Sequence, residues 1–357
     1  MDDDDNLFDN DMIEQSVVYS DPMKGVKHKI PWSEKHRPKK LQDIIYQHEV
    51  VKVLSECLKT GKLTHMLFYG PPGTGKTSSI LSFCNELYGP NIINQRVIEL
   101  NASDERGINV VRNKIITFAK TAVGNPDPDY PSPPFKIIIL DEADAMTTEA
   151  QSALRTVMES MSNVTRFCFV CNYINQIIDP IASRCMKFRF RPINEVAMKQ
   201  KLQTVSIAEK FPISDNVLDK LVELVKGDVR HGIMTLQYLK YIYDYQGNIT
   251  IHDVYKTTNY LPIEEVQKLW KIIVLPTTTI KNIKSEIYNL KQKGYSIHAV
   301  IEQISTTLVN KKDLNDKQKS LICIKMSDIE KMLIDGADEY LQLFSLLATI
   351  HGVYRRV

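Results

Sequence analysis

The chain has 357 residues, of which 43% are hydrophobic and 25% are charged, and its formal net charge at pH 7 is +2. This length is sufficient for two or three domains with sizeable cores. No apolar run approaches the ~18 residues of a membrane span, which excludes a membrane-spanning protein. The opening Met-Asp-Asp-Asp-Asp is the reverse of a secretory signal peptide, so we expect a soluble intracellular protein whose six cysteines are reduced.

The charge is unevenly distributed along the chain. Residues 1–14 contain seven acidic residues and no Lys or Arg, so the remainder carries 45 basic and 36 acidic side chains, a balance of +9. Repelling charges with few apolar residues predict a disordered acidic extension over residues 1–29. The mildly basic remainder is compatible with binding to a polyanion, although a solvated basic face is the commoner explanation of such a balance.

A phosphate-binding loop follows an apolar run at residues 65–69. Residues 70–77 read Gly-Pro-Pro-Gly-Thr-Gly-Lys-Thr, which fits G-x-x-x-x-G-K-[ST], and apolar residues recur at helical spacing after it. The glycines let backbone N–H groups converge on phosphate oxygens, Lys76 adds a positive charge for the β- and γ-phosphates, and Thr77 offers a hydroxyl to Mg²⁺. The sequence therefore predicts a nucleoside triphosphate site. Its predicted residues in this loop are Gly70, Pro71, Pro72, Gly73, Thr74, Gly75, Lys76, Thr77 and Ser78.

Acidic residues follow a second apolar run, residues 135–140, at the start of an Asp-Glu-Ala-Asp sequence. A continuous apolar run is typical of a buried parallel strand, and ligands collect at the carboxyl ends of such strands. Alone, these acids would more often belong to a solvated loop or a helix cap. Beside a phosphate loop, Asp141 is predicted to hold Mg²⁺ and Glu142 to polarise the water that attacks the γ-phosphate.

The sequence Asp-Glu-Ala-Asp also occurs in RNA helicases, but the residues that follow it argue against a helicase. The next buried run, residues 167–171, ends in Asn172, and the Ser-Ala-Thr and late arginine-rich motifs of helicases are absent from the sequence. Asn172 at a strand tip is predicted to hydrogen-bond the attacking water or the γ-phosphate. The third strand thus adds a polar group to the same predicted site.

Two arginines complete the predicted set. Arg184, in a Ser-Arg-Cys triplet, lies beyond a helical stretch and is predicted to point away from its own nucleotide, as an arginine finger supplied in trans to a neighbouring subunit. Arg230, in Gly-Asp-Val-Arg, is a possible phosphate contact from the following domain. A single Asn or Arg of this kind is more often a surface residue. The prediction of an ATP-hydrolysing site rests on the order of five elements along the chain: the phosphate loop, the acidic pair, Asn172, Arg184 and Arg230.

That order resembles the AAA+ ATPases, and the sequence between the motifs resembles the small subunits of replication factor C, the eukaryotic sliding-clamp loader, from about residue 30 to the end. The likeness is greatest to the type called subunit four in humans and two in budding yeast. It rests on residues 31–38 (Pro-Trp-Ser-Glu-Lys-His-Arg-Pro), 99–108 (Glu-Leu-Asn-Ala-Ser-Asp-Glu-Arg-Gly-Ile), 183–185, 187–190, 314–320 and 335–339.

The resemblance implies an α/β fold in which an AAA+ P-loop domain with a parallel sheet precedes a small helical lid and a C-terminal all-helical collar. Turn-forming residues and the period of the apolar residues divide the chain into three domains. These are residues 30–192 for the nucleotide domain, 193–260 for the lid and 261–357 for the collar. Helical stripes in the last segment predict a bundle core. These stripes comprise Ile297, Val300, Ile301, Ile304 and Leu308, and Leu343, Leu346, Leu347 and Ile350.

The resemblance also implies ATP and Mg²⁺ as cofactors and a nuclear hetero-pentamer that acts in replication and repair. Its partners would be other loader subunits, a ring-shaped sliding clamp (PCNA) and primer-template DNA, with no membrane. Ser33, Arg37 and Ile45 would border the adenine nucleotide, although Ser33 replaces a usual valine. Two alternatives are a non-hydrolysing structural subunit that only donates Arg184, and a uniform homo-oligomeric AAA+ remodeller.

Candidate DNA contacts lie on two predicted helices. Arg106 precedes a helix whose apolar face leaves Arg112 and Lys114 on another side, and the start of that helix also favours phosphate. Arg155 is the remaining arginine of a family Ala-Leu-Arg-Arg run in which Thr156 replaces the second arginine. In the related loaders such helices track the duplex backbone, which gives recognition of shape with little reading of base sequence.

Overall fold

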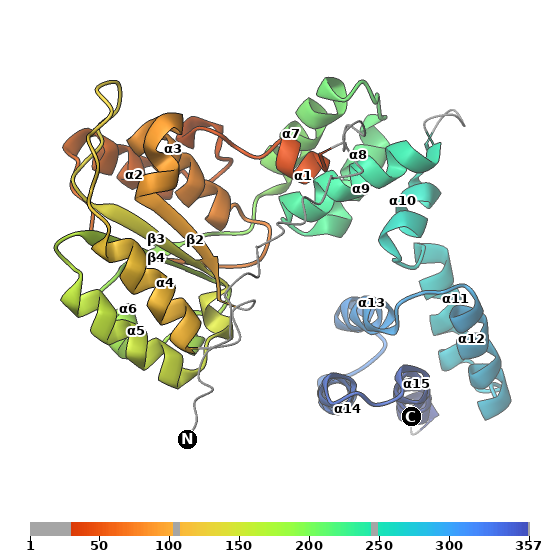
Figure 1. Cartoon of the computed structure of the whole chain (residues 1–357). Helices are drawn as coiled ribbons and strands as arrows, with labels where there is room; N and C mark the ends of the chain where they lie inside the picture. The colour runs from red at the N-terminus through yellow and green to blue at the C-terminus, as the bar shows by residue number, and fades with distance from the viewer. Residues whose placement is uncertain (1–29, 103–107, 244–248, 356–357) are drawn as a thin grey trace, which may run out of the picture.

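The computed structural model describes residues 30–102, 108–243 and 249–355. Three bodies follow one another along the chain, and Figure 1 shows them as a sheet flanked by helices, a group of helices beside it and a second helical group below that. In the part of the chain that the structure describes, no helix is both long and apolar enough to cross a bilayer.

The first body is built on a five-stranded, wholly parallel sheet. Its strands are β1 (Met66–Tyr69), β2 (Val97–Asn101), β3 (Lys136–Asp141), β4 (Thr165–Cys171) and β5 (Met186–Arg189), in the order β2-β3-β4-β1-β5. β1, which leads into the phosphate loop, therefore has β4 beside it and β3 one strand further away. This order brings the carboxyl ends of the predicted site strands to one edge of the sheet.

Helices cover both faces of the sheet. The helices α2 (His48–Thr60) and α3 (Lys76–Arg96) pack on one face, whereas α4 (Ile108–Lys120), α5 (Thr148–Ser160) and α6 (Asp179–Ala182) cover the other. Side chains of β1, β2, β3 and β4 alternate between the two cores, as the period of a strand requires, whereas the edge strand β5 contributes only Phe188 to a core. Both faces are apolar, which explains the continuous hydrophobic runs of β3 and β4. Short 3₁₀ turns occur at Leu41–Asp43, Ala143–Ala145 and Ile174–Gln176.

Within the described residues, the second body contains four helices with a core of their own. They are α7 (Glu195–Ala208), α8 (Asp215–Val225), α9 (Val229–Tyr243) and α10 (Ile251–Thr258). The short helix α1 (Trp32–Lys35) joins this body, although we predicted it with the nucleotide domain (Figure 1).

Packing, hydrogen-bonding and charge contacts attach α1 to the lid helices. Trp32 is only 6% exposed and packs in the lid core, and its backbone N–H donates to Gln237 Oε1 at 3.0 Å. The ammonium of Lys240 lies over its indole ring, and Lys35 forms an ion pair with Glu209 at 2.7 Å. The first described helix of the chain thus packs with the lid, and the segments that follow it form the sheet domain.

The third body is an all-helical bundle. Its helices are α11 (Ile263–Val274), α12 (Ile280–Gln292), α13 (Ile297–Asn310), α14 (Asp316–Ile334) and α15 (Glu339–Arg355). Every residue of the two predicted apolar stripes, on α13 and α15, is buried in one hydrophobic cluster. The prediction of a bundle core in this segment is confirmed.

Candidate nucleotide site

The phosphate loop connects β1 to α3 and depends on its glycines. Gly73 and Gly75 have φ of +66° and +93°, in the left-handed region that side chains disfavour. A Cβ on Gly70 would lie 2.3 Å from the carbonyl oxygen of Phe190, so the loop packs against the chain beyond β5. These positions account for the glycine-rich sequence and leave the N-terminus of α3 open to phosphate.

Lys76 is a buried cation at the first position of α3. Its Nζ donates to the carbonyl oxygens of Gly70 and Pro71, both at 2.8 Å, and to Asn172 Oδ1 at 2.9 Å. Burial lowers the pKa of Lys76, an effect that Asp141 opposes. The structure thus brings the predicted residues of β1, β3 and β4 to one point.

Two oxygen ligands suited to Mg²⁺ lie together at this point. Thr77 Oγ1 donates to Asp141 Oδ2 at 2.8 Å, which joins the predicted hydroxyl and carboxylate ligands across two elements. Hard oxygen donors of this kind fit Mg²⁺, which retains several waters besides its protein ligands. Glu142 follows in the left-handed conformation, φ +52°, with its side chain exposed.

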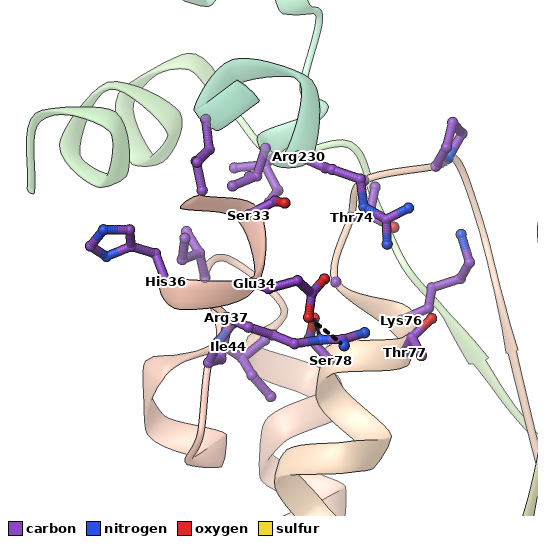
Figure 2. Close-up of a pocket in the computed structure, with 18 of the residues that line it drawn as sticks. Ser33, Glu34, His36, Arg37, Ile44, Thr74, Lys76, Thr77, Ser78 and Arg230 are labelled. Carbon is purple, nitrogen blue, oxygen red and sulfur yellow. Dashed lines mark hydrogen bonds and ion pairs between the residues drawn. The ribbon is translucent and has the colours of Figure 1, made fainter. Parts of the chain in front are cut away.

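A cavity of about 280 Å³ extends from this point between the sheet domain and the lid. Ser33, Arg37 and Ile45, which the resemblance implied for the adenine side, line this cavity, and Arg37 Nε donates to Ser78 Oγ at 3.3 Å. Figure 2 shows Arg37 beside Ser78, with its ion pair to Glu34 at 3.0 Å. Of the predicted loop residues, 72–78 line the cavity directly, whereas Gly70 and Pro71 act through their carbonyl oxygens.

Apart from Arg230, sequence reasoning missed the contribution of the lid to this cavity. Ile193, Lys201, Val229 and Ile233 line it, and of these only Val229 belongs to a segment that the sequence analysis singled out. Burial lowers the pKa of Lys201, which lines the cavity from α7. The sequence could not place Lys201 at the cavity, because that position depends on how α7 packs beside the segment that carries Arg37.

The lid touches the phosphate loop through the start of α9. The N–H of Val229 donates to the carbonyl oxygen of Gly73 at 3.2 Å, and Asp228 Oδ1 accepts the N–H of His231 at 2.9 Å. Arg230, the next residue, lines the cavity and extends from the lid toward Thr74 in Figure 2. Arg230 is therefore positioned to contact a phosphate.

Arg184, the predicted arginine finger, is not among the residues that line the cavity. Its guanidinium donates to the carbonyl oxygen of Pro180 at 2.7 Å and forms an ion pair with Glu159 at 2.8 Å. Arg155 binds the same carboxylate oxygen at 3.0 Å. A predicted arginine finger and a predicted DNA contact thus share Glu159.

The remaining DNA candidates lie on or near α4. Lys114 is exposed there. Arg112 belongs to the same helix, but its side chain is outside the described part of the structure, and Arg106 lies outside the described residues.

The fold and the site define a P-loop ATPase of the AAA+ class. Residues 66–193 match the family model AAA, the ATPase family associated with various cellular activities. The Thermotoga maritima RuvB Holliday junction branch migration motor has a similar structure, with a TM-score of 0.51, 16% identity and coverage of 75% of this chain and 91% of that one. At this identity the likeness shows the fold alone.

The C-terminal bundle and the full-length relatives narrow the class. Residues 261–349 match the replication factor C C-terminal domain. Replication factor C subunit 2 of Oryza sativa is 44% identical over 91% of this chain and 95% of its own length, and subunit 4 of Homo sapiens is 42% identical over 90% and 88%. The chain belongs to the replication factor C small-subunit family and is an ATPase subunit of a multi-subunit clamp loader of DNA replication.

Proposed function

We propose that this chain binds ATP with Mg²⁺ in the cavity described above, as one subunit of a nuclear hetero-pentamer. Binding of ATP opens a ring-shaped sliding clamp (PCNA) and grips a primer-template junction, and hydrolysis releases the clamp around DNA. The observation that carries the proposal is a complete hydrolytic set around one cavity: Lys76, Thr77, Asp141, Glu142, Asn172.

Each of these residues has a separate task. Lys76 neutralises the β- and γ-phosphates with its ammonium group, which the carbonyl oxygens of Gly70 and Pro71 and the amide of Asn172 hold in place. When bound by Thr77 and Asp141, Mg²⁺ supplies further neutralisation of charge. Glu142 is exposed at the cavity and orients the attacking water. Asn172 holds that water or the γ-phosphate from the adjacent strand.

The charge that develops on the γ-phosphate requires further cations. Arg230 contributes from the lid of the same subunit, and the corresponding arginine finger comes from a neighbour. Arg184 performs this task in turn for the adjoining site, since it is outside its own cavity and 40% exposed. Ordered packing of subunits is thereby a condition of hydrolysis.

The DNA contacts are the cationic residues predicted on α4 and α5, together with Arg106. They bind phosphates along the duplex, which makes recognition depend on shape and salt concentration more than on base sequence. The exposed positions of Lys114 and Arg155 support this assignment.

The proposal is tested in a reconstituted loader with labelled clamp and primed circular DNA. Glu142→Gln in this subunit alone should preserve assembly and ATP binding but lower DNA-stimulated ATP turnover and the number of clamps loaded. Unchanged turnover and loading would favour the alternative of a non-hydrolysing subunit that only donates Arg184. Native mass spectrometry of the complex tests the hetero-pentamer, because a single repeated mass would indicate the homo-oligomeric remodeller.

A further inference from the structure

Asp144 is the last residue of the Asp-Glu-Ala-Asp sequence and has no task in the site described above. It lies in the 3₁₀ turn Ala143–Ala145 that follows β3. Its Oδ2 accepts two adjacent backbone N–H groups, that of Asn172 at 2.9 Å and that of Tyr173 at 3.1 Å. One carboxylate oxygen thus holds the chain where β4 ends.

This chain end has little other support. β4 ends at Cys171, so the next two N–H groups leave the ladder of the sheet. The Asn172 side chain is exposed, and Tyr173 is 67% exposed. An ionised acceptor makes stronger hydrogen bonds to backbone N–H groups than a neutral one. Asp144 is therefore the group that determines where the backbone of Asn172 lies.

The position of Asn172 matters because its side chain reaches the phosphate loop. Asn172 Oδ1 accepts from Lys76 Nζ at 2.9 Å. A continuous chain of hydrogen bonds therefore runs from Asp144 through Asn172 to Lys76. Asp144 itself is not among the residues that line the cavity. Its hydrogen-bonded route to the nucleotide passes through Asn172, and its negative charge in addition raises the pKa of Lys76.

Two other tasks for Asp144 fit the geometry less well. Among the described residues, no group of three His, Cys, Asp or Glu side chains converges as a metal site, so Asp144 does not form one with Asp141 and Glu142. A general base requires a carboxylate facing the reacting water. Asp144 Oδ2 is instead occupied by two N–H donors, and the side chain lies outside the cavity lining.

We propose that Asp144 is a positioning residue for ATP hydrolysis, which fixes the backbone of Asn172 so that its amide meets the γ-phosphate and the attacking water. The inference rests on the proposed function, in which Asn172 acts on these groups.

The test uses the reconstituted loader with the phosphate-loop lysines of the other subunits replaced, so that turnover reports this subunit. Asp144→Ala should leave the Kd for ATP within about twofold, because Lys76 and the loop glycines remain. The kcat should fall about tenfold to a hundredfold, the range that a displaced positioning group produces. Asp144→Asn retains an acceptor oxygen of the same shape and should restore part of the kcat.

A double-mutant cycle separates positioning from general stability. Asn172→Ala should lower kcat about as much as Asp144→Ala, and the double variant should show no further loss, because both act through the same amide. Additive losses, or a Kd raised as far as by Lys76→Ala, would overturn the proposal.

Asp253 provides a matched control, because it makes the same kind of contact far from the cavity. Its Oδ2 accepts the N–H of Thr250 at 2.9 Å at the start of α10. Asp253→Ala should lower the Tm and leave kcat unchanged. If Asp144→Ala behaves in the same way, its carboxylate is structural and the proposal is wrong. Failure of clamp loading with these kcat effects intact would instead contradict the proposed function alone.

Discussion

Gly73→Ala should separate the lid from the phosphate loop, because no space exists there for a methyl group. A Cβ at this position would lie 1.8 Å from Asp228 Oδ1, and φ is +66°. The carboxylate of Asp228 must then move away from the N–H of His231, which it accepts at 2.9 Å near the start of α9. Asp228 precedes Val229, whose N–H donates to the carbonyl oxygen of Gly73, so any backbone shift that relieves the clash also stretches this bond between lid and loop.

The magnitude follows from two contributions. A non-glycine residue in the left-handed region costs roughly 1 kcal/mol, and loss of a helix cap costs about 1 kcal/mol more. Gly73→Ala should therefore lower the free energy of unfolding by about 2 kcal/mol and the Tm by roughly 6 °C. Loss of the loop's alignment with Arg230 should weaken ATP binding about tenfold, which corresponds to roughly 1.4 kcal/mol.

Gly61→Ala is the matched control. Gly61 has a similar φ, +65°, at the end of α2, and a Cβ there would meet no atom within 4 Å. It should cost about half as much stability and leave ATP affinity unchanged. Thermal melts and calorimetric titration with ATP measure both quantities. Equal effects of the two substitutions, or no recovery of affinity when Asp228→Ser is added to Gly73→Ala, would refute the clash.

The assignments of hydrolytic residues and DNA contacts yield three more predictions. Lys76→Ala should abolish measurable ATP binding at this subunit, whereas Glu142→Gln should bind ATP normally and hydrolyse it slowly; equal losses of affinity in a titration would contradict this division. Arg184→Ala should leave this chain's ATP affinity unchanged and lower turnover at the adjoining site, where an arginine finger is worth roughly 10³- to 10⁵-fold, and mixing with a hydrolysis-dead neighbour locates the defect. Arg155→Ala should reduce the slope of log affinity for primed DNA against log salt by about one, and an unchanged slope across a salt titration would remove it from the DNA contacts.

The sequence predicted those parts of the site that are determined by short segments. The phosphate loop needs glycine at positions of positive φ, and β3 and β4 need continuous apolar residues because both faces of the sheet are covered. Both requirements are met by residues that are adjacent in the sequence, so they can be recognised there. The positions of Lys76, Asp141 and Asn172 at one edge then followed from the parallel arrangement alone.

Contacts between distant segments left no such marks. The backbone of Trp32 bonds Gln237, 205 residues away, so nothing in the local sequence assigns α1 to the lid. Lys201 enters the cavity only because α7 packs nearby. The pairing of Arg155 with Glu159 could have been predicted from its i,i+4 spacing. The addition of Arg184 to the same carboxylate could not, because it depends on the turn after α6.

The attachment of α1 to the lid has a thermodynamic consequence. Ser33 and Arg37 line the cavity from a segment anchored on lid helices, whereas Lys76 and Thr77 line it from the sheet. A nucleotide that spans the cavity therefore selects one angle between the two bodies. Neighbouring subunits that favour the same angle between the two bodies raise the affinity of this chain for ATP. By linkage, ATP strengthens the binding of those neighbours by the same factor. The gain in ATP affinity on assembly and the gain in subunit association on ATP binding therefore measure the same coupling free energy.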